Sequence, residues 1–153
     1  MEKMLSLKLA ITAAFSALCT FLGWKGILAV AWVIAMALDY LSGTIAACKT
    51  GEWSSATARS GLAHKGGMIL VVAASCIADI VLYAVCTEVN IGFEWPVLIF
   101  PVVIAWYVVT ELGSILENSV KLGAAVPEWL TKLLKIGLKA IDAAGEKVVP
   151  KDE

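Results

Sequence analysis

Two aspartates lie inside long apolar stretches, and a carboxylate in such a place needs a chemical explanation. Asp39 interrupts an apolar run over residues 27–48, and Asp79 interrupts another over residues 66–87. A carboxylate near the centre of a bilayer costs about 2.5–3.5 kcal/mol even on the lenient insertion scale. A polar partner, a water-filled face or protonation must therefore offset the cost of each aspartate.

Small or polar residues accompany both aspartates, and also Glu111, at helical spacing. The three stripes are Ala31, Ala35, Asp39, Gly43 and Ala47; Ser75, Asp79 and Tyr83; and Tyr107, Glu111, Ser114 and Asn118. Steps of three and four place the members of each stripe on one face of a helix. A small-residue face such as the first stripe lets two membrane helices approach closely.

Two hypotheses explain these stripes. In the first, they face a shared interior that fills with water when several copies assemble. In the second, they only hold helices together within one folded chain. The first hypothesis assigns the oligomer or pore-lining surface to Asp39, Gly43, Asp79, Glu111, Ser114 and Asn118, and close helix packing to Ala31, Ala35 and Ala47.

Other kinds of chemistry have little support. The chain has one histidine, His64, so a Ser-His-Asp triad cannot be argued, and it has neither a P-loop nor a nucleotide-binding glycine motif. Its four cysteines show no CxxC spacing, which disfavours a zinc site. We therefore expect no enzyme, no catalytic residue, no cofactor and no metal.

The composition indicates how these residues are positioned. Of the 153 residues 60% are apolar and 16% are charged, whereas soluble domains are typically about 45–50% apolar and about 25% charged. The mean hydropathy is +0.86. A net charge of −1 leaves no basic surplus for nucleic acid. The sequence predicts an all-α integral membrane protein whose partners are the bilayer and other copies of itself.

Four segments approach the roughly 20 apolar residues that a membrane helix needs. They cover residues 5–24, 27–48, 66–87 and 95–118, and together they predict a transmembrane domain over residues 1–118. The first segment is the least secure, because it reaches 20 residues only if Lys8 extends to the interface. We expect it to be a retained helix rather than a cleaved signal peptide, joined to the second segment by a tight turn at residues 23–26.

Charges in the connections predict the orientation. Residues 49–65 form a Gly- and Ser-rich loop with three basic residues against one acid, a net +2, and residues 88–94 carry two glutamates, a net −2. Because basic loops stay in the cytoplasm, the first loop should be cytoplasmic and the second external. With four spans in the bacterial inner membrane, both termini would then be cytoplasmic.

Residues 119–153 form a cytoplasmic tail that contains a predicted amphipathic helix over about 127–147. Its charged residues follow each other in steps of four and three: Glu128, Lys132, Lys135, Lys139, Asp142 and Glu146. Such a helix either lies on the inner leaflet, with the three lysines at the membrane surface, or covers a neighbouring subunit.

Three motifs carry a resemblance to a known family. Residues 37–43, which read ALDYLSG, resemble the second-segment signature of the phage lysis and toxin-secretion holin family. Ser54, Ser55, Gly61 and Lys65 resemble the short basic loop of that family. The stretch ELGSILEN at 111–118, followed by Gly123 and then Val126 and Pro127, is similar to its ending, although Thr110 stands where the family commonly has Asn.

The resemblance implies a small, multi-pass inner-membrane protein of a phage or prophage. Such holins accumulate, oligomerise and open holes that let an endolysin reach the cell wall, and relatives export large toxins; no direct contact with the endolysin is predicted. Two alternatives remain open on the residues alone. One is a small proton- or ion-coupled channel or transporter, and the other is a non-permeabilising scaffold or antiholin.

Overall fold

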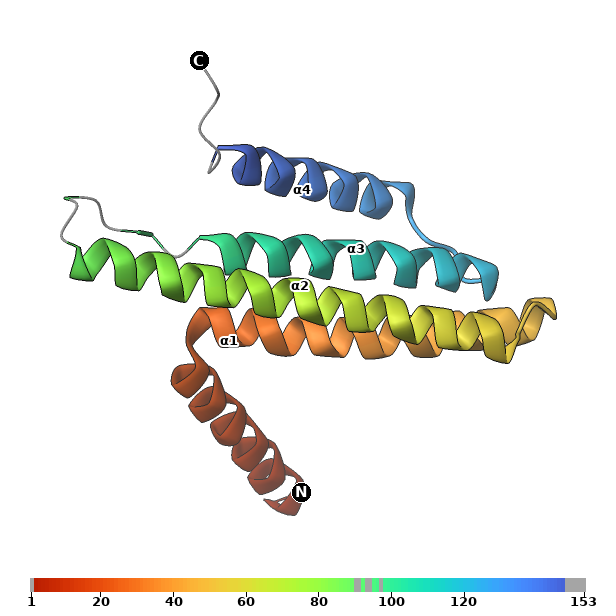
Figure 1. Ribbon diagram of the computed structural model, residues 1–153. Coiled ribbons are helices and arrows are strands. Elements are labelled where there is room, and N and C mark those ends of the chain that lie inside the picture. Colours follow the sequence, from red (N-terminus) through yellow and green to blue (C-terminus); the bar gives the residue numbers. More distant parts are fainter. Residues whose placement is uncertain (1, 90–91, 93–94, 97, 148–153) are drawn as a thin grey trace.

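The computed structural model describes residues 2–89, 92, 95, 96 and 98–147, and it describes their side chains from Gly23 onward. The described residues form helices and loops, without strands. The four helices are α1 (Glu2–Thr50), α2 (Ser55–Glu88), α3 (Ile99–Lys121) and α4 (Glu128–Glu146) (Figure 1).

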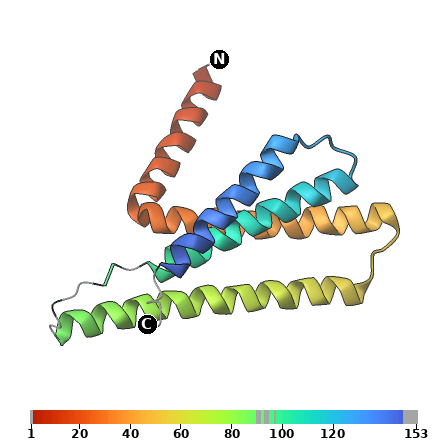
Figure 2. The same ribbon diagram turned by 90° about the horizontal axis from the view of Figure 1, so that it is seen from above.

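Helix α1 bends at a single residue. Gly23 has φ 63° and ψ −179°, a backbone conformation that glycine adopts without the strain imposed by a side chain. The arm formed by residues 2–22 therefore diverges from the rest of α1 (Figures 1 and 2). The tight turn expected at residues 23–26 is a bend confined to Gly23, because helical geometry resumes directly after this residue.

Three helical segments are long and apolar enough to cross a membrane: Gly23–Thr50, Ser55–Glu88 and Ile99–Lys121. These are three candidate spans within the part described with side chains, from Gly23 onward, against an expected count of about four for the whole chain; the expected segment at 5–24 lies almost wholly ahead of that part. Its uninterrupted apolar run, residues 9–24, would measure about 24 Å as a helix, which is short of a bilayer core of about 30 Å.

Helix α2 begins eleven residues earlier than the composition suggested. The Ser54 hydroxyl accepts a hydrogen bond from the backbone N–H of Thr57 at 3.1 Å and caps the helix, so residues 55–65 are helical rather than a loop. The 34 residues of α2 measure about 51 Å, so one end of this helix extends beyond a bilayer core of about 30 Å.

Helix α3 is central, since it packs against each of the other three helices. The core between α1, α2 and α3 contains Trp32, Met68, Val72 and Ile104, and Ile104 is fully buried. The Trp32 ring also stacks on Tyr107 of α3 with 6.1 Å between the ring centroids. This core fixes how far the three helices can separate and how their faces are turned.

Helix α4 occupies the range expected for the amphipathic helix, and it folds back along α3 (Figure 2). The indole N–H of Trp106 donates a hydrogen bond of 2.8 Å to Asp142, which joins the two helices. The structure thus shows a third placement for this helix, against the α3 of its own chain. Residues 148–153 of the expected tail lie outside the described residues.

Candidate functional site: an ionic network between three helices

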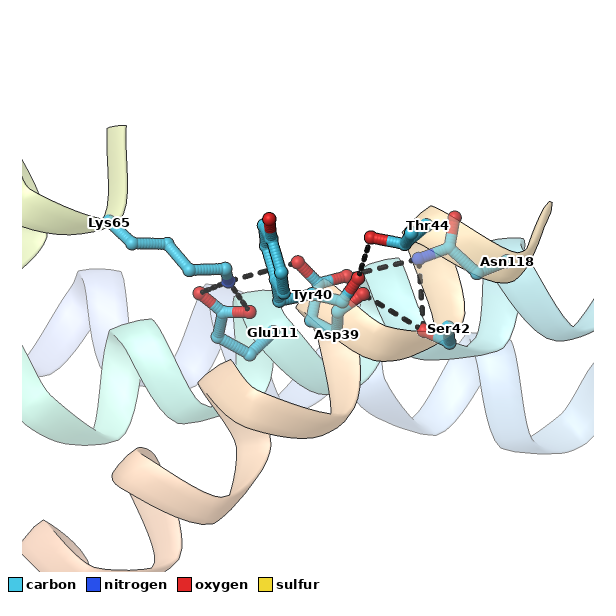
Figure 3. A network of polar contacts seen from close by, with 7 residues as sticks. All are labelled: Asp39, Tyr40, Ser42, Thr44, Lys65, Glu111 and Asn118. Atoms are coloured by element: carbon cyan, nitrogen blue, oxygen red, sulfur yellow. Dashed lines mark hydrogen bonds and ion pairs between the residues drawn. The ribbon is translucent and has the colours of Figure 1, made fainter. Parts of the chain in front are cut away.

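Three charged side chains from three different helices meet in one network (Figure 3). Lys65 Nζ of α2 lies 2.9 Å from Oδ2 of Asp39 on α1. The same ammonium group donates to both carboxylate oxygens of Glu111 on α3, at 2.8 and 2.7 Å. The Glu111 side chain is only 4% exposed, against 13% for Lys65 and 18% for Asp39. Lys65 therefore binds two acids from neighbouring helices at once.

An amide extends the network toward the far end of α3. Asn118 Nδ2 donates to Asp39 Oδ1 and to Ser42 Oγ, each at 3.1 Å (Figure 3). Asp39 thus uses one oxygen for Lys65 and the other for Asn118. A buried polar group is costly without a partner, and each of these side chains has at least one.

The spacing of buried residues explains why these groups converge. On α1, buried Trp32, Ala35 and Ala46 share a face with Asp39 in steps of three, four and seven. On α3, the buried residues Ile104, Glu111 and Asn118 follow each other in steps of seven, and on α2 Lys65 precedes Met68, Val72, Ser75 and Asp79 in steps of three and four. Asp39, Lys65 and Glu111 therefore lie on the buried faces of their helices, and these three faces meet between α1, α2 and α3.

A glycine makes the close contact between α1 and α3 possible. A Cβ atom added at Gly43 would lie 3.3 Å from Asn118 Nδ2, which is already held by two hydrogen bonds. Gly43 also borders a cavity of about 330 Å³ between α1, α2 and α3. Asp39, Lys65, Glu111 and Ser114 line the same cavity.

Asp79 does not join this network. Its Oδ1 accepts hydrogen bonds from the Trp95 indole at 2.8 Å and the backbone N–H of Ile99 at 3.1 Å, and its Oδ2 accepts from the N–H of Phe100 at 2.8 Å. Asp79 is 1% exposed. It therefore supplies a negative charge and a cap to the first turn of α3 from outside that helix.

The opposite end of α3 is capped from α1. Lys49 Nζ donates to the carbonyl oxygen of Leu122, just past the last helical residue, at 2.6 Å. A cation at a helix C-terminus is favourable because the last carbonyl groups carry partial negative charge. Both ends of α3 thus receive the charge that suits them from another helix.

The remaining predicted residues lie in two other environments. Ala35 is buried, Ala31 and Ala47 are partly buried, and Ala46, which the four-residue stripe omits, is only 2% exposed. Lys132, Lys135 and Lys139 are exposed on α4. In the described part of the chain, no three His, Cys, Asp or Glu side chains are grouped so that they could hold a metal ion.

Sequence reasoning missed the role of Lys65. The charge pattern predicts a hydrated loop for this residue, whereas it lies on α2 and binds Asp39 and Glu111. A signal was present, because the face of Asp79 continues toward the N-terminus through Ser75, Val72 and Met68 to Lys65. The pore-lining role of the acids stays a prediction; within one chain Asp39 and Glu111 bind Lys65, and Asp79 binds the start of α3.

Comparison with known proteins supplies the family. The model of the bacteriophage holin family matches residues 16–139. An uncharacterized protein of Halalkalibacterium halodurans is 32% identical over 136 residues, which cover 89% of this chain and 95% of that protein. An uncharacterized protein of Listeria monocytogenes is 36% identical over 98 residues, and one of Clostridium perfringens is 34% identical over 99 residues; each match covers 64% of this chain, and respectively 62% and 65% of the relative. No solved structure matches.

The family match covers α2, α3, most of α1 and most of α4, so it includes every residue of the ionic network. The chain is all-helical in its described part, and three of its helices have the length and composition of membrane spans. On these grounds the chain is a holin-like membrane protein and belongs to the bacteriophage holin family.

Proposed function

We propose that this chain is a holin, which accumulates in the bacterial cytoplasmic membrane, oligomerises and opens holes that release an endolysin for host cell lysis. The observation that carries the proposal is the pairing of the membrane-embedded charges inside one chain of this family. Lys65 binds Asp39 and Glu111, and Asp79 is bound by the start of α3. A single chain can therefore reside in lipid without exposing these charges.

The outer surface of the same helices supports this step. Large apolar side chains such as Leu38, Leu41, Leu70 and Ile77 are half or more exposed, which suits contact with lipid tails. With this apolar exterior and a paired interior, the three spans can accumulate without leakage. Hole formation then depends on contacts between copies, and a threshold concentration for such contacts would give lysis a set time.

The orientation follows from the charges at the two ends of the helices. Lys49 and Arg59 lie at the end where α1 meets α2, and this end is proposed to face the cytoplasm. Three spans then place Gly23 outside and Lys121 inside. Before a hole assembles, both termini are cytoplasmic only if the arm at residues 2–22 crosses as a fourth span, which an active or inactive alkaline phosphatase fused ahead of the arm would decide.

A small ion-coupled channel or transporter is the second candidate, and one observation favours it. The acid–lysine network lines a cavity of about 330 Å³ rather than being sealed on all sides. Ionisable residues within membrane segments often mark ion or proton pathways. This function would require selective ion flux across the membrane of cells that remain intact.

The decisive experiment is induced expression in a bacterium while membrane potential and the release of a folded cytoplasmic reporter enzyme are followed over time. A holin gives an abrupt collapse of the potential after a delay, together with enzyme release. Loss of potential without enzyme release would support the channel, and an intact membrane at high expression would support a scaffold or antiholin.

Two conservative variants test the ionic network in the same assay. Asp39→Asn and Glu111→Gln keep the size of each side chain but remove its charge, so they should change the delay before lysis. Glu88→Gln is the matched control, because Glu88 is exposed at the last residue of α2 and forms no ion pair with the described residues. Unchanged timing in both network variants would remove these acids from the mechanism.

A further inference from the structure

Helix α4 folds back along α3, and its contacts reach the N-terminal part of α3. About a third of the way along α3, Trp106 binds Asp142. Farther along, a Cβ atom added at Gly145 would lie 3.7 Å from Cγ1 of Val102. The last turns of α4 also share a cavity with the segment that precedes α3, which is lined by Trp95, Pro96, Leu98, Ala140, Ala143, Ala144 and Lys147. The C-terminal end of α4 therefore reaches the end of α3 opposite to Lys121.

This placement has a consequence for depth in the membrane. Helix α3 is one of the three candidate spans. The 19 residues of α4 measure about 28 Å, close to the thickness of a bilayer core of about 30 Å. A helix of this length, folded back along a spanning helix, occupies the same depth as the span itself.

The surface of α4 is divided into three faces at a rotation of about 100° per residue. One face is partly buried toward α3 and contains Leu130, Leu134, Leu138, Ile141 and Gly145. A second face is exposed and charged, and it contains Glu128, Lys132, Lys135, Lys139, Asp142 and Glu146. A third face is exposed and apolar, and it contains Trp129, Leu133, Ile136, Ala140 and Ala143.

Three faces fit a position inside the wall of a hole. One face meets α3, the second needs water, and the third suits the apolar surroundings of the membrane. Charged side chains are costly in lipid, so a charged face at membrane depth requires water beside it along the whole helix. Lipid alone cannot provide that water, but the interior of an assembled hole can.

We propose that α4 crosses the membrane beside α3 in the assembled hole, and that its charged face lines the water-filled lumen. The proposal rests on the holin function proposed above and adds the residues that meet the passing protein. The face carries three lysines and three acids, so its net charge is zero. Such a lumen would accept folded proteins of either net charge, because it neither attracts nor repels one sign as a whole.

Spin labels at three positions on one face of α4 test the depth directly. In a full-length chain with its four cysteines replaced by serine, single cysteines at Trp129, Ile136 and Ala143 lie seven residues apart on the apolar face. Each variant is reconstituted at hole-forming density in vesicles of bacterial phospholipid. Collision with oxygen, which concentrates in lipid, and with a water-soluble nickel chelate then reports the depth of each label.

The crossing arrangement predicts that the label at Ile136 is the deepest and that those at Trp129 and Ala143 are shallower. Equal depths at all three positions would place α4 on the membrane surface and overturn the proposal. Labels at Leu112 and Val120 of α3, both exposed in the single chain, calibrate the depth scale. A label at Lys135 should collide with the nickel chelate more often than the neighbouring label at Ile136. Equal collision rates would contradict the proposal that the charged face lines a water-filled lumen.

A disulfide cross-link tests the position of α4 beside α3 without a spin label. The pair Val102→Cys and Gly145→Cys should form a disulfide in membranes on mild oxidation, since the added Cβ atom at Gly145 already touches Val102. The pair Val102→Cys and Glu128→Cys is the matched control and should not form one, because Glu128 begins α4 at its other end.

Dye leakage from the same vesicles separates the two proposals. Persistent leakage with equal label depths, or without the Val102–Gly145 cross-link, overturns the lumen assignment and leaves the holin function in place. A depth maximum at Ile136 without any leakage overturns the holin function while leaving the position of α4 intact.

Discussion

Removal of the Lys65 charge should destabilise the bundle strongly. In Lys65→Met the side chain keeps its apolar stem but loses the ammonium group that holds Asp39 and Glu111. The Glu111 side chain, only 4% exposed, would then face Asp39 with neither of its Lys65 hydrogen bonds. Helix α2 touches α1 far less than it touches α3, so without Lys65 its position would depend on its contacts with α3.

The expected size follows from the burial of the pair. Removing one partner of a buried ion pair costs about 3–5 kcal/mol, because the other charge stays behind without compensation. For a domain of about 150 residues each kcal/mol lowers the Tm by about 2–4 °C, so the Tm should fall by roughly 6–20 °C. Lys132→Met removes an exposed pair worth about 0.3–0.5 kcal/mol and should lower the Tm by at most about 2 °C.

Thermal unfolding of the detergent-solubilised protein measures this difference, with the near-ultraviolet circular dichroism of the buried aromatic residues as the signal. The triple variant Asp39→Asn, Lys65→Met and Glu111→Gln should recover much of the loss, because no uncompensated charge of the network remains. If Lys65→Met unfolds at the same temperature as Lys132→Met, the network does not hold the helices together and the reasoning is refuted.

Three further variants test other contacts. Asp79→Asn should cost about 1.5–3 kcal/mol by weakening charged hydrogen bonds, and faster amide exchange at Phe100 would report the frayed end of α3; unchanged exchange would contradict the capping role. Gly43→Ala should be about 1–3 kcal/mol less stable than Gly66→Ala, where the added Cβ meets open space, and equal melting temperatures would contradict the close contact. Trp106→Phe should cost about 0.5–1.5 kcal/mol and slow the cross-linking of α3 to α4, whereas an unchanged rate would show that the indole bond does not hold α4.

Much of the helical content and two of the three charged partners could be predicted from sequence. Asp39 and Glu111 stood out because a charge inside an apolar helix is costly and periodicity assigns it to a face. Lys65 did not stand out, because a lysine beside Gly- and Ser-rich sequence also fits a hydrated loop. Its position on α2 depends on the cap at Ser54, which extends the helix through polar residues.

The partner of Asp79 was beyond sequence reasoning for a different reason. Periodicity placed Asp79 on a polar stripe, but the groups that bind it include the backbone N–H groups of Ile99 and Phe100. Every residue except proline has such a group, so no residue type announces the contact. In the same way, the pattern of α4 revealed an amphipathic helix but could not show that α3 of the same chain covers one of its faces.

The caps of α3 bear on the order in which the protein is made. Asp79 at one end and Lys49 at the other belong to helices that leave the ribosome before α3 does. Until residues 99–122 are synthesised, neither side chain has this partner, and Asp79 alone would weigh against stable residence of α2 in lipid. Translation of α3 supplies the partners of both residues, so we expect membrane insertion of the first two helices to become irreversible only when the third emerges.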